Sequence, residues 1–259
     1  MKLISIFISA VFAICGCCVV NGLSGIMETS VLEVPSEYTS IEVSNSISVK
    51  WSTDATAAVL TADKDVIPYV KVELSGNTLK IYIADSCCRF MRGVGKVDVC
   101  LPAVQKLDCV KLSGASSFSS ETPLTAESLW IGASGASAFN ADIVASEKVS
   151  VNLSGASKAV SVIEASELDI DASGASYAKV SGKVPVFSVN VSGASKVSSG
   201  NERVSAGDVT CSVSGASSLY VNCTAKIDGD VSGASKVRFG DAGAVSTLSA
   251  SGASSVSAD

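Results

Sequence analysis

Short segments of alternating apolar and polar residues fill the C-terminal half of this 259-residue chain, on both sides of a recurring Ser-Gly-Ala-Ser motif. Positions one and three before the motif and two after it are almost always apolar, whereas the positions between them are mostly polar. Alternation with a period of two predicts β-strands that bury one face, and no helical periodicity competes with it. The eight copies begin at Ser113, Ser134, Ser154, Ser173, Ser192, Ser214, Ser232 and Ser251.

The spacing of the motif predicts how these strands are arranged. Successive copies begin 18 to 22 residues apart, which leaves no room for helices between the strands. A repeat of this length is typical of units that bury their apolar faces only against their neighbours. We therefore predict an all-β fold, a parallel β-helix (solenoid) whose coils stack about 4.8 Å apart.

The motif itself is expected to form a corner between two strands. Glycine permits a positive φ angle at a bend, and serine hydroxyls can hydrogen-bond the backbone groups that a bend leaves unpaired. We expect the small alanine side chain to point into a narrow corner of the core. Gly229 is the one weak inward position, where Ile227 and Val231 are expected to maintain the core.

The N-terminal third lacks the motif but keeps the strand pattern, with alternating runs at residues 41–51, 57–61, 69–74, 78–83 and 96–101. Ser75-Gly76-Asn77 predicts a tight hairpin turn between two of these runs. Residues 85–95 are expected to form a loop, and Pro68 and Pro102 to lie at strand edges. Because a solenoid end needs protection against edge-to-edge association, we expect this segment to be a cap.

The first residues read as an export signal, with Lys2 followed by an apolar run over residues 3–14. Ile14-Cys15-Gly16-Cys17 resembles a bacterial lipobox, in which Cys17 would be lipidated; plain cleavage after Gly22 is the alternative. In either case the mature protein leaves the cytoplasm, and a lipid tether would need no transmembrane helix. The predicted organisation is a lipoprotein-type signal peptide (1–17), a short tether (18–29), an N-terminal β segment (30–111) and the β-helix (112–259).

Composition limits the possible partners and cofactors. The 19 basic residues are outnumbered by 25 acidic ones, so the basic footprint of a nucleic-acid-binding protein is missing. There is no histidine, and the nine cysteines are not spaced as zinc ligands, so we expect no metal and no cofactor. Cys211 and Cys223 fall at inward positions and are expected to be small buried apolar residues. A disulfide between Cys100 and Cys109 is left open.

The order of pieces resembles one protein family. A β-rich segment at 40–51 is followed by VELSGNTLKIYI (72–83), KVDVCLP (96–102), KLSGASSF and the repeated motif. This arrangement is similar to the putative auto-transporter adhesin, head GIN domain family of bacterial exported proteins, many of them lipoproteins. The resemblance implies a right-handed parallel β-helix with a β-rich N-terminal part. It also implies a location in the envelope of a Gram-negative bacterium, as an outer-membrane lipoprotein facing either the surface or the periplasm.

The family supplies no catalytic motif, and we expect a non-catalytic adhesin or binding module. Its partner would be a glycan or a host or envelope protein, which would contact the polar columns on the outside of the coils. The candidate ligand-facing residues, taken from the positions flanking the motif, are Lys158, Tyr177, Lys196, Asn152, Asp171 and Asn190.

Two other functions remain open at this point. A polysaccharide-active enzyme would need clustered carboxylates on the coils, and the pairs Asp169/Asp171 and Asp228/Asp230 are the nearest approach to that pattern. We expect these acids to be solubilising surface charges instead. A structural or self-assembling envelope component is the remaining alternative.

Overall fold

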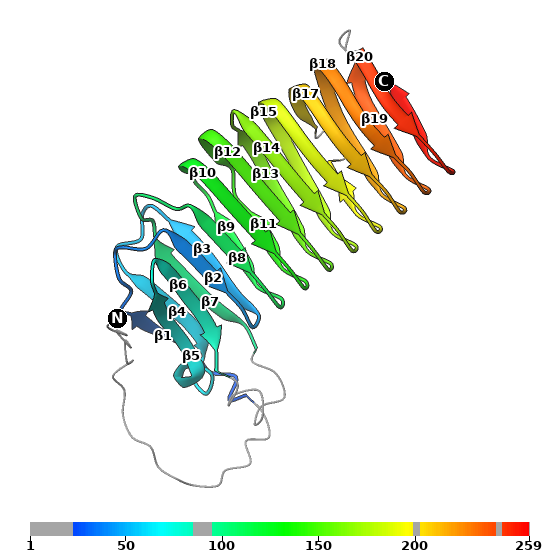
Figure 1. The fold of residues 1–259 in the computed structure, drawn as a ribbon. Coiled ribbons are helices and arrows are strands. Elements are labelled where there is room, and N and C mark those ends of the chain that lie inside the picture. Colours follow the sequence, from blue (N-terminus) through cyan, green and yellow to red (C-terminus); the bar gives the residue numbers. More distant parts are fainter. Residues whose placement is uncertain (1–22, 85–94, 199–202, 242–244, 259) are drawn as a thin grey trace.

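The computed structural model describes residues 23–84, 95–198, 203–241 and 245–258. The signal sequence with Cys17 and most of the loop expected at 85–95 lie outside these residues. The chain forms one long β-solenoid, whose coils stack from the N-terminal to the C-terminal end (Figure 1). Within the described ranges, no helix has the length and apolarity needed to cross a membrane.

Each coil contributes to two principal parallel sheets that meet at the Ser-Gly-Ala-Ser corner. The sheet before the corner, here called the pre-corner sheet, contains β2 (Ser40–Val43), β6 (Thr78–Ile83), β8 (Cys109–Leu112), β10 (Leu124–Ala133), β12 (Ile143–Leu153), β14 (Glu167–Ala172), β17 (Val204–Val213) and β20 (Val245–Ala250). The post-corner sheet contains β3 (Ile47–Ser52), β7 (Val97–Pro102), β9 (Ser117–Ser120), β11 (Ala138–Asn140), β13 (Lys158–Glu164), β16 (Lys196–Val197), β19 (Lys236–Asp241) and β21 (Ser255–Ala258).

Two long strands, β15 (Tyr177–Val191) and β18 (Ser218–Val231), run through both sheets. Their first residues pair in the post-corner sheet and their last residues in the pre-corner sheet. Between these halves lies a short third side of the coil, where Gly182 pairs with Val204 and Val204 pairs with Val221.

The inward columns form the continuous core that the alternation predicts. Val110, Ile131 and Val151 stack in register and are at most 1% exposed. On the post-corner side the rings of Phe118 and Phe139 stack with centroids 5.5 Å apart. Ile227 and Val231 are also fully buried beside Gly229, as expected.

The corner confirms the expected role of glycine and corrects that of alanine. The motif glycines have φ angles near +70°, and corner backbones hydrogen-bond from coil to coil, as from Ala136 N to Gly114 O at 2.7 Å. The motif alanines are exposed, and the second serine of each described copy up to Ser235 is buried instead. A left-handed glycine turns the next side chain outward and the following one inward. A buried serine then bonds a corner carbonyl, as Ser116 Oγ does to Ser113 O at 2.8 Å.

The parallel stack continues into the N-terminal third in an order that differs from the sequence. The coil formed by β2 and β3 lies between the coil of β8 and β9 and that of β6 and β7. The run expected at 41–51 is therefore two strands, because the chain turns at Asn45 and Ser46, whose φ angles are 64° and 66°. These two residues take the place of the motif at this corner.

Antiparallel strands end the parallel stack at this end of the molecule. β5 (Val70–Ser75) pairs with β6 through the expected hairpin turn at Gly76, and β4 (Ala58–Asp63) pairs with β7. β1 (Met27–Leu32) then pairs with β4. A 3-10 turn, η1 (Ile67–Tyr69), contains Pro68, and Pro102 closes β7. These strands form the cap that the sequence predicts.

Candidate binding surface

The first column of candidate residues lies on the outward face of the post-corner sheet. Lys158 pairs with Tyr177, and Tyr177 with Lys196, so the three side chains occupy successive coils at one register position. The same column continues through Ser218 and Lys236. The structure therefore aligns these candidates along the solenoid axis.

Aromatic rings are interleaved with the cations of this column. Lys158 Nζ lies 5.8 Å from the centroid of the Tyr177 ring, and Lys196 Nζ lies 5.3 Å from that of Tyr220. The Arg203 guanidinium carbon is 5.9 Å from the same Tyr220 ring. Such cation–π contacts hold the ammonium groups near the surface without neutralising their charge.

The second column of candidates lies on the other principal sheet. Asn152, Asp171 and Asn190 are in register on the pre-corner strands, and Asn190 Nδ2 donates a hydrogen bond to Asp171 Oδ1 at 2.8 Å. Because the Ser-Gly-Ala-Ser corner separates this column from that of Lys158, the structure brings the candidates together as two surfaces facing different directions.

The two sheets differ in charge from the third motif onward. The first residues of the post-corner strands, at 158–161, 177–180, 196–197, 218–221, 236–239 and 255–258, contain no acid, whereas β13 and β19 end on Glu164 and Asp241. The surface formed by these first residues, here called the basic face, carries Lys158, Lys179, Lys196, Lys236 and Arg238. The pre-corner strands at 148–153, 167–172, 186–191, 208–213, 226–231 and 245–250 form the acidic face, with Glu167, Asp169, Asp171, Asp208, Asp228 and Asp230 against Lys148 and Lys226. A chain with a net charge of −6 thus has one basic side.

The carboxylates considered for catalysis are engaged in local contacts on the acidic face. Lys148 Nζ lies 2.8 Å from Glu167 Oε1 and also pairs with Asp169. Asp228 accepts a hydrogen bond from Thr247 Oγ1 at 2.6 Å and pairs with Lys226, and both contacts lower the pKa of its carboxyl. The lowered pKa of Asp228 is the opposite of the raised pKa expected of a general acid.

The residues that the structure describes contain neither a metal-binding cluster nor a disulfide bond. No group of three or more His, Cys, Asp or Glu side chains within it is placed to hold a metal ion. Cys100 and Cys109 are not bonded to each other, so the bridge left open between them is not formed in this structure. Burial raises the pKa of the Cys211 thiol to about 12, which makes it a poor nucleophile and metal ligand.

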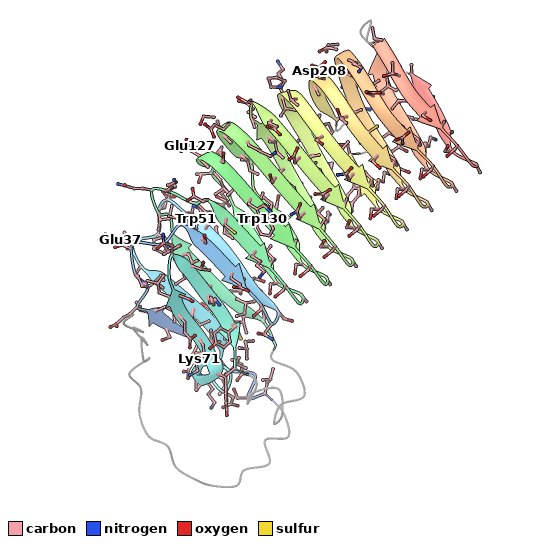
Figure 2. The ribbon with its side chains drawn as sticks, in the orientation of Figure 1. Glu37, Trp51, Lys71, Glu127, Trp130 and Asp208 are labelled. Atoms are coloured by element: carbon pink, nitrogen blue, oxygen red, sulfur yellow. The ribbon has the colours of Figure 1, made fainter. Side chains whose placement is uncertain are left out.

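Sequence reasoning missed a small pocket around Trp130 of β10. Figure 2 labels Trp130 on the ribbon. The pocket has a volume of about 350 Å³, and it is lined by Lys106, Asp108, Glu127, Ser128, Leu129, Trp130, Lys148 and Ser150. The six-membered ring of Trp130 covers the space that a side chain at Gly132 would occupy. The available signal was a tryptophan at an outward position with glycine two residues later.

A larger groove of about 1230 Å³ runs beneath the segment that precedes β2. Its walls include Leu32, Val34, Pro102 and Val104, with Tyr38 at its base. The Tyr38 ring packs edge-on against Trp51 at 6.4 Å, and its hydroxyl is buried with no hydrogen-bond partner among the described residues. The groove is also lined by polar and charged residues, among them Glu33, Glu37 and Lys106.

Several solved structures have the same fold. A putative adhesin from Parabacteroides distasonis is 21% identical, with a TM-score of 0.77 over 92% of this chain and 98% of that one. A putative adhesin from Parabacteroides merdae is 17% identical, with a TM-score of 0.70 over 93% and 98% of the two chains. A putative lipid binding protein from P. distasonis is 19% identical, with a TM-score of 0.69 over 93% and 99%. At these identities the likeness establishes the fold alone.

Comparison with protein families is more specific. No curated protein matches the chain significantly. A family model described as putative auto-transporter adhesin, head GIN domain matches residues 37–162 and 150–242. These matches span both the N-terminal coils and most of the repeats. The chain therefore belongs to the putative auto-transporter adhesin, head GIN domain family.

Proposed function

We propose that the protein is a non-catalytic binding module of the bacterial cell envelope, an adhesin-like protein that presents an elongated recognition surface. The observation that carries this proposal is the in-register column of Lys158, Tyr177 and Lys196, repeated along a stiff stack of coils. A recognition surface of this kind is organised before the ligand arrives, because its side chains are held by strands that are paired on both edges. Ligand binding therefore requires little further loss of conformational entropy from these side chains.

The proposal includes a lipid anchor on Cys17, which would make the protein an outer-membrane lipoprotein of a Gram-negative cell. The sequence Ile14-Cys15-Gly16-Cys17 motivates it. Metabolic labelling with a palmitate analogue is expected to mark the wild-type protein and the Cys15→Ala variant, but to fail with Cys17→Ala. Label retained by Cys17→Ala would rule out lipidation at this residue.

The binding role is tested with purified protein beginning at residue 23, probed against immobilised glycans and extracellular-matrix proteins. A Lys158→Gln, Tyr177→Ala, Lys196→Gln variant is expected to lose most of the binding seen with the wild type. The matched control is Asn152→Ala, Asp171→Asn, Asn190→Ala, which changes the second candidate column, on the pre-corner sheet. Equal binding by the wild type and the first variant would exclude the Lys158 column as the recognition surface. Absence of binding to every probe by the wild type would refute the proposed function itself.

A further inference from the structure

The basic face has a regular spacing of charge along the solenoid. Lys158, Lys196 and Lys236 lie on every second coil of one column, because Tyr177 and Ser218 occupy the coils between them. With about 4.8 Å between neighbouring strands, successive lysines of this column are about 9.6 Å apart. None of these three lysines forms an ion pair with a described residue.

The neighbouring column strengthens the same side. Tyr220 pairs with Arg238 on the next coil, and Arg238 Nε is buried without a hydrogen-bond partner among the described residues. Because this Nε atom is buried, Arg238 contributes to the face through its positive charge and not through a free hydrogen bond. The basic face therefore combines three lysines that form no ion pair with a described residue and the half-exposed rings of Tyr177 and Tyr220.

We infer that this face binds an acidic polysaccharide with a carboxylate on alternate sugars, laid along the solenoid axis. This inference rests on the proposed binding function and names its ligand class. One coil rise is close to the length of one linked pyranose ring, so a disaccharide repeat matches the two-coil spacing of the lysines. Each sugar carboxylate would then meet one lysine, and the sugar between would lie over Tyr177 or Ser218. Tyrosine offers such a ring an apolar surface together with a hydroxyl.

The charge density of the face argues against nucleic acid. Duplex DNA carries a charge about every 1.7 Å along its axis, several times denser than the lysines of this column. A membrane surface fits poorly as well. From β13 onward, Val160 and Val162 are the aliphatic side chains larger than alanine on the outward positions of the described post-corner strands, and both lie on one strand, so insertion into lipid would gain little. A sparse, linear polyanion is the polymer that matches both features.

The experiment uses the purified chain from residue 23 and two forms of hyaluronan of equal length. Native hyaluronan has one carboxylate in each disaccharide, and carboxyl-reduced hyaluronan has none. We expect calorimetry to detect binding of the native form alone, with an affinity that falls as sodium chloride is added. The variant Lys158→Gln, Lys196→Gln, Lys236→Gln is expected to bind about tenfold more weakly, as the loss of three exposed ion pairs implies.

A charge-matched control separates the basic face from net charge. Lys111→Gln, Lys148→Gln, Lys226→Gln removes the same number of lysines from the pre-corner sheet and is expected to bind like the wild type. Thermal unfolding of both variants confirms that each is folded. Equal losses in the two variants would show that net charge, rather than this face, governs binding, and would overturn the inference.

Other outcomes distinguish this inference from the broader proposal. If the wild type binds matrix proteins or neutral glycans but not native hyaluronan, the ligand class is wrong while the binding function stands. Tighter binding to duplex DNA, or to vesicles containing phosphatidylglycerol, than to native hyaluronan would also overturn the ligand class. If the wild type binds none of these probes, both proposals fail together.

Discussion

Gly174 lies so close to Gly155 that a β-carbon on Gly174 would stand 2.7 Å from the Gly155 carbonyl oxygen. The same oxygen accepts a hydrogen bond from Ala175 N at 2.8 Å, and the φ angle of Gly174 is +76°. The corner thus needs glycine both for its backbone conformation and for the close stacking of one coil on the next.

Replacing Gly174 with alanine should therefore destabilise the solenoid. The left-handed backbone alone costs an alanine about 1–2 kcal/mol, and the contact with Gly155 adds to this. We expect urea unfolding followed by circular dichroism to show a loss of at least this size. Ala175→Ser, at the exposed neighbouring position, should unfold like the wild type. A Gly174→Ala protein as stable as the wild type would contradict this account of the corner.

Tyr38→Phe should stabilise the N-terminal end. The Tyr38 hydroxyl is buried and has no hydrogen-bond partner in the described part of the chain, so its removal ends an uncompensated desolvation of about 1–3 kcal/mol. The ring contact with Trp51 remains in the variant. A rise of about 1 kcal/mol in the free energy of unfolding is expected at neutral pH. A loss of stability would mean that the hydroxyl has a favourable contact.

Stability should fall at alkaline pH for two identifiable reasons. Burial raises the pKa of Tyr38 above its usual value, and burial with the nearby Asp228 and Asp230 raises that of Cys211 to about 12. The unfolded chain releases these protons first, near pH 8.5 for the thiol and about pH 10 for the phenol. The stabilisation that each protonated group provides is fully present below its pKa in the unfolded chain, and it is lost as the pH rises from that pKa toward the higher pKa in the folded protein.

Urea unfolding at a series of alkaline pH values measures this effect. The free energy of unfolding of the wild type should fall with rising pH. In Cys211→Val this fall should be smaller from about pH 8.5 upward, where the thiol of the unfolded chain titrates. In Tyr38→Phe the fall should be smaller only at higher pH. Identical curves for all three proteins would show that neither group is responsible.

Gly132→Ala should displace the ring of Trp130 without disturbing the strand. Gly132 does not have a positive φ angle, and its new β-carbon would meet only the far end of the Trp130 side chain. We expect a red shift in tryptophan emission and easier quenching by acrylamide, since Trp51 remains buried. Gly240→Ala, where the β-carbon would meet Asn222 instead, is the matched control. Unchanged tryptophan emission would show that the Trp130 ring does not lie against Gly132.

The repeats were predictable because their pattern is local. Each inward column, such as Val110, Ile131 and Val151, is fixed by its distance from the motif, and stacking keeps that register. The direction of the motif alanine was not predictable in this way. Alanine and serine are both small, and the choice depends on which of them can satisfy a carbonyl inside the corner, as Ser116 does.

The order of the N-terminal coils was beyond sequence reasoning for a different reason. β2 pairs with β8, which lies far along the chain, and nothing local marks that partnership. The break at Asn45 and Ser46 was hidden because the alternation of residues 41–51 resembles one strand. Two polar residues in the middle of that run were the available hint.

The candidate surface was only partly accessible from sequence. The alignment of Lys158, Tyr177 and Lys196 followed from their equal distance from the motif, as the register confirms. Their separation from Asn152, Asp171 and Asn190 depends on the turn of the corner, which places two columns six residues apart on different sheets. The segregation of charge becomes visible only when each sheet is considered by itself.

The position of β2 and β3 has a consequence for how the chain can assemble. This coil is joined on one edge by β6 and β7 and on the other by β8 and β9. A chain that emerges N-terminus first can complete the antiparallel end of the molecule before any repeat appears. Each later coil then meets a finished edge made about 20 residues earlier, so its loop-closure cost is small. The coil nearest the start of the chain is a template for one-directional growth, in step with the order in which the residues arrive.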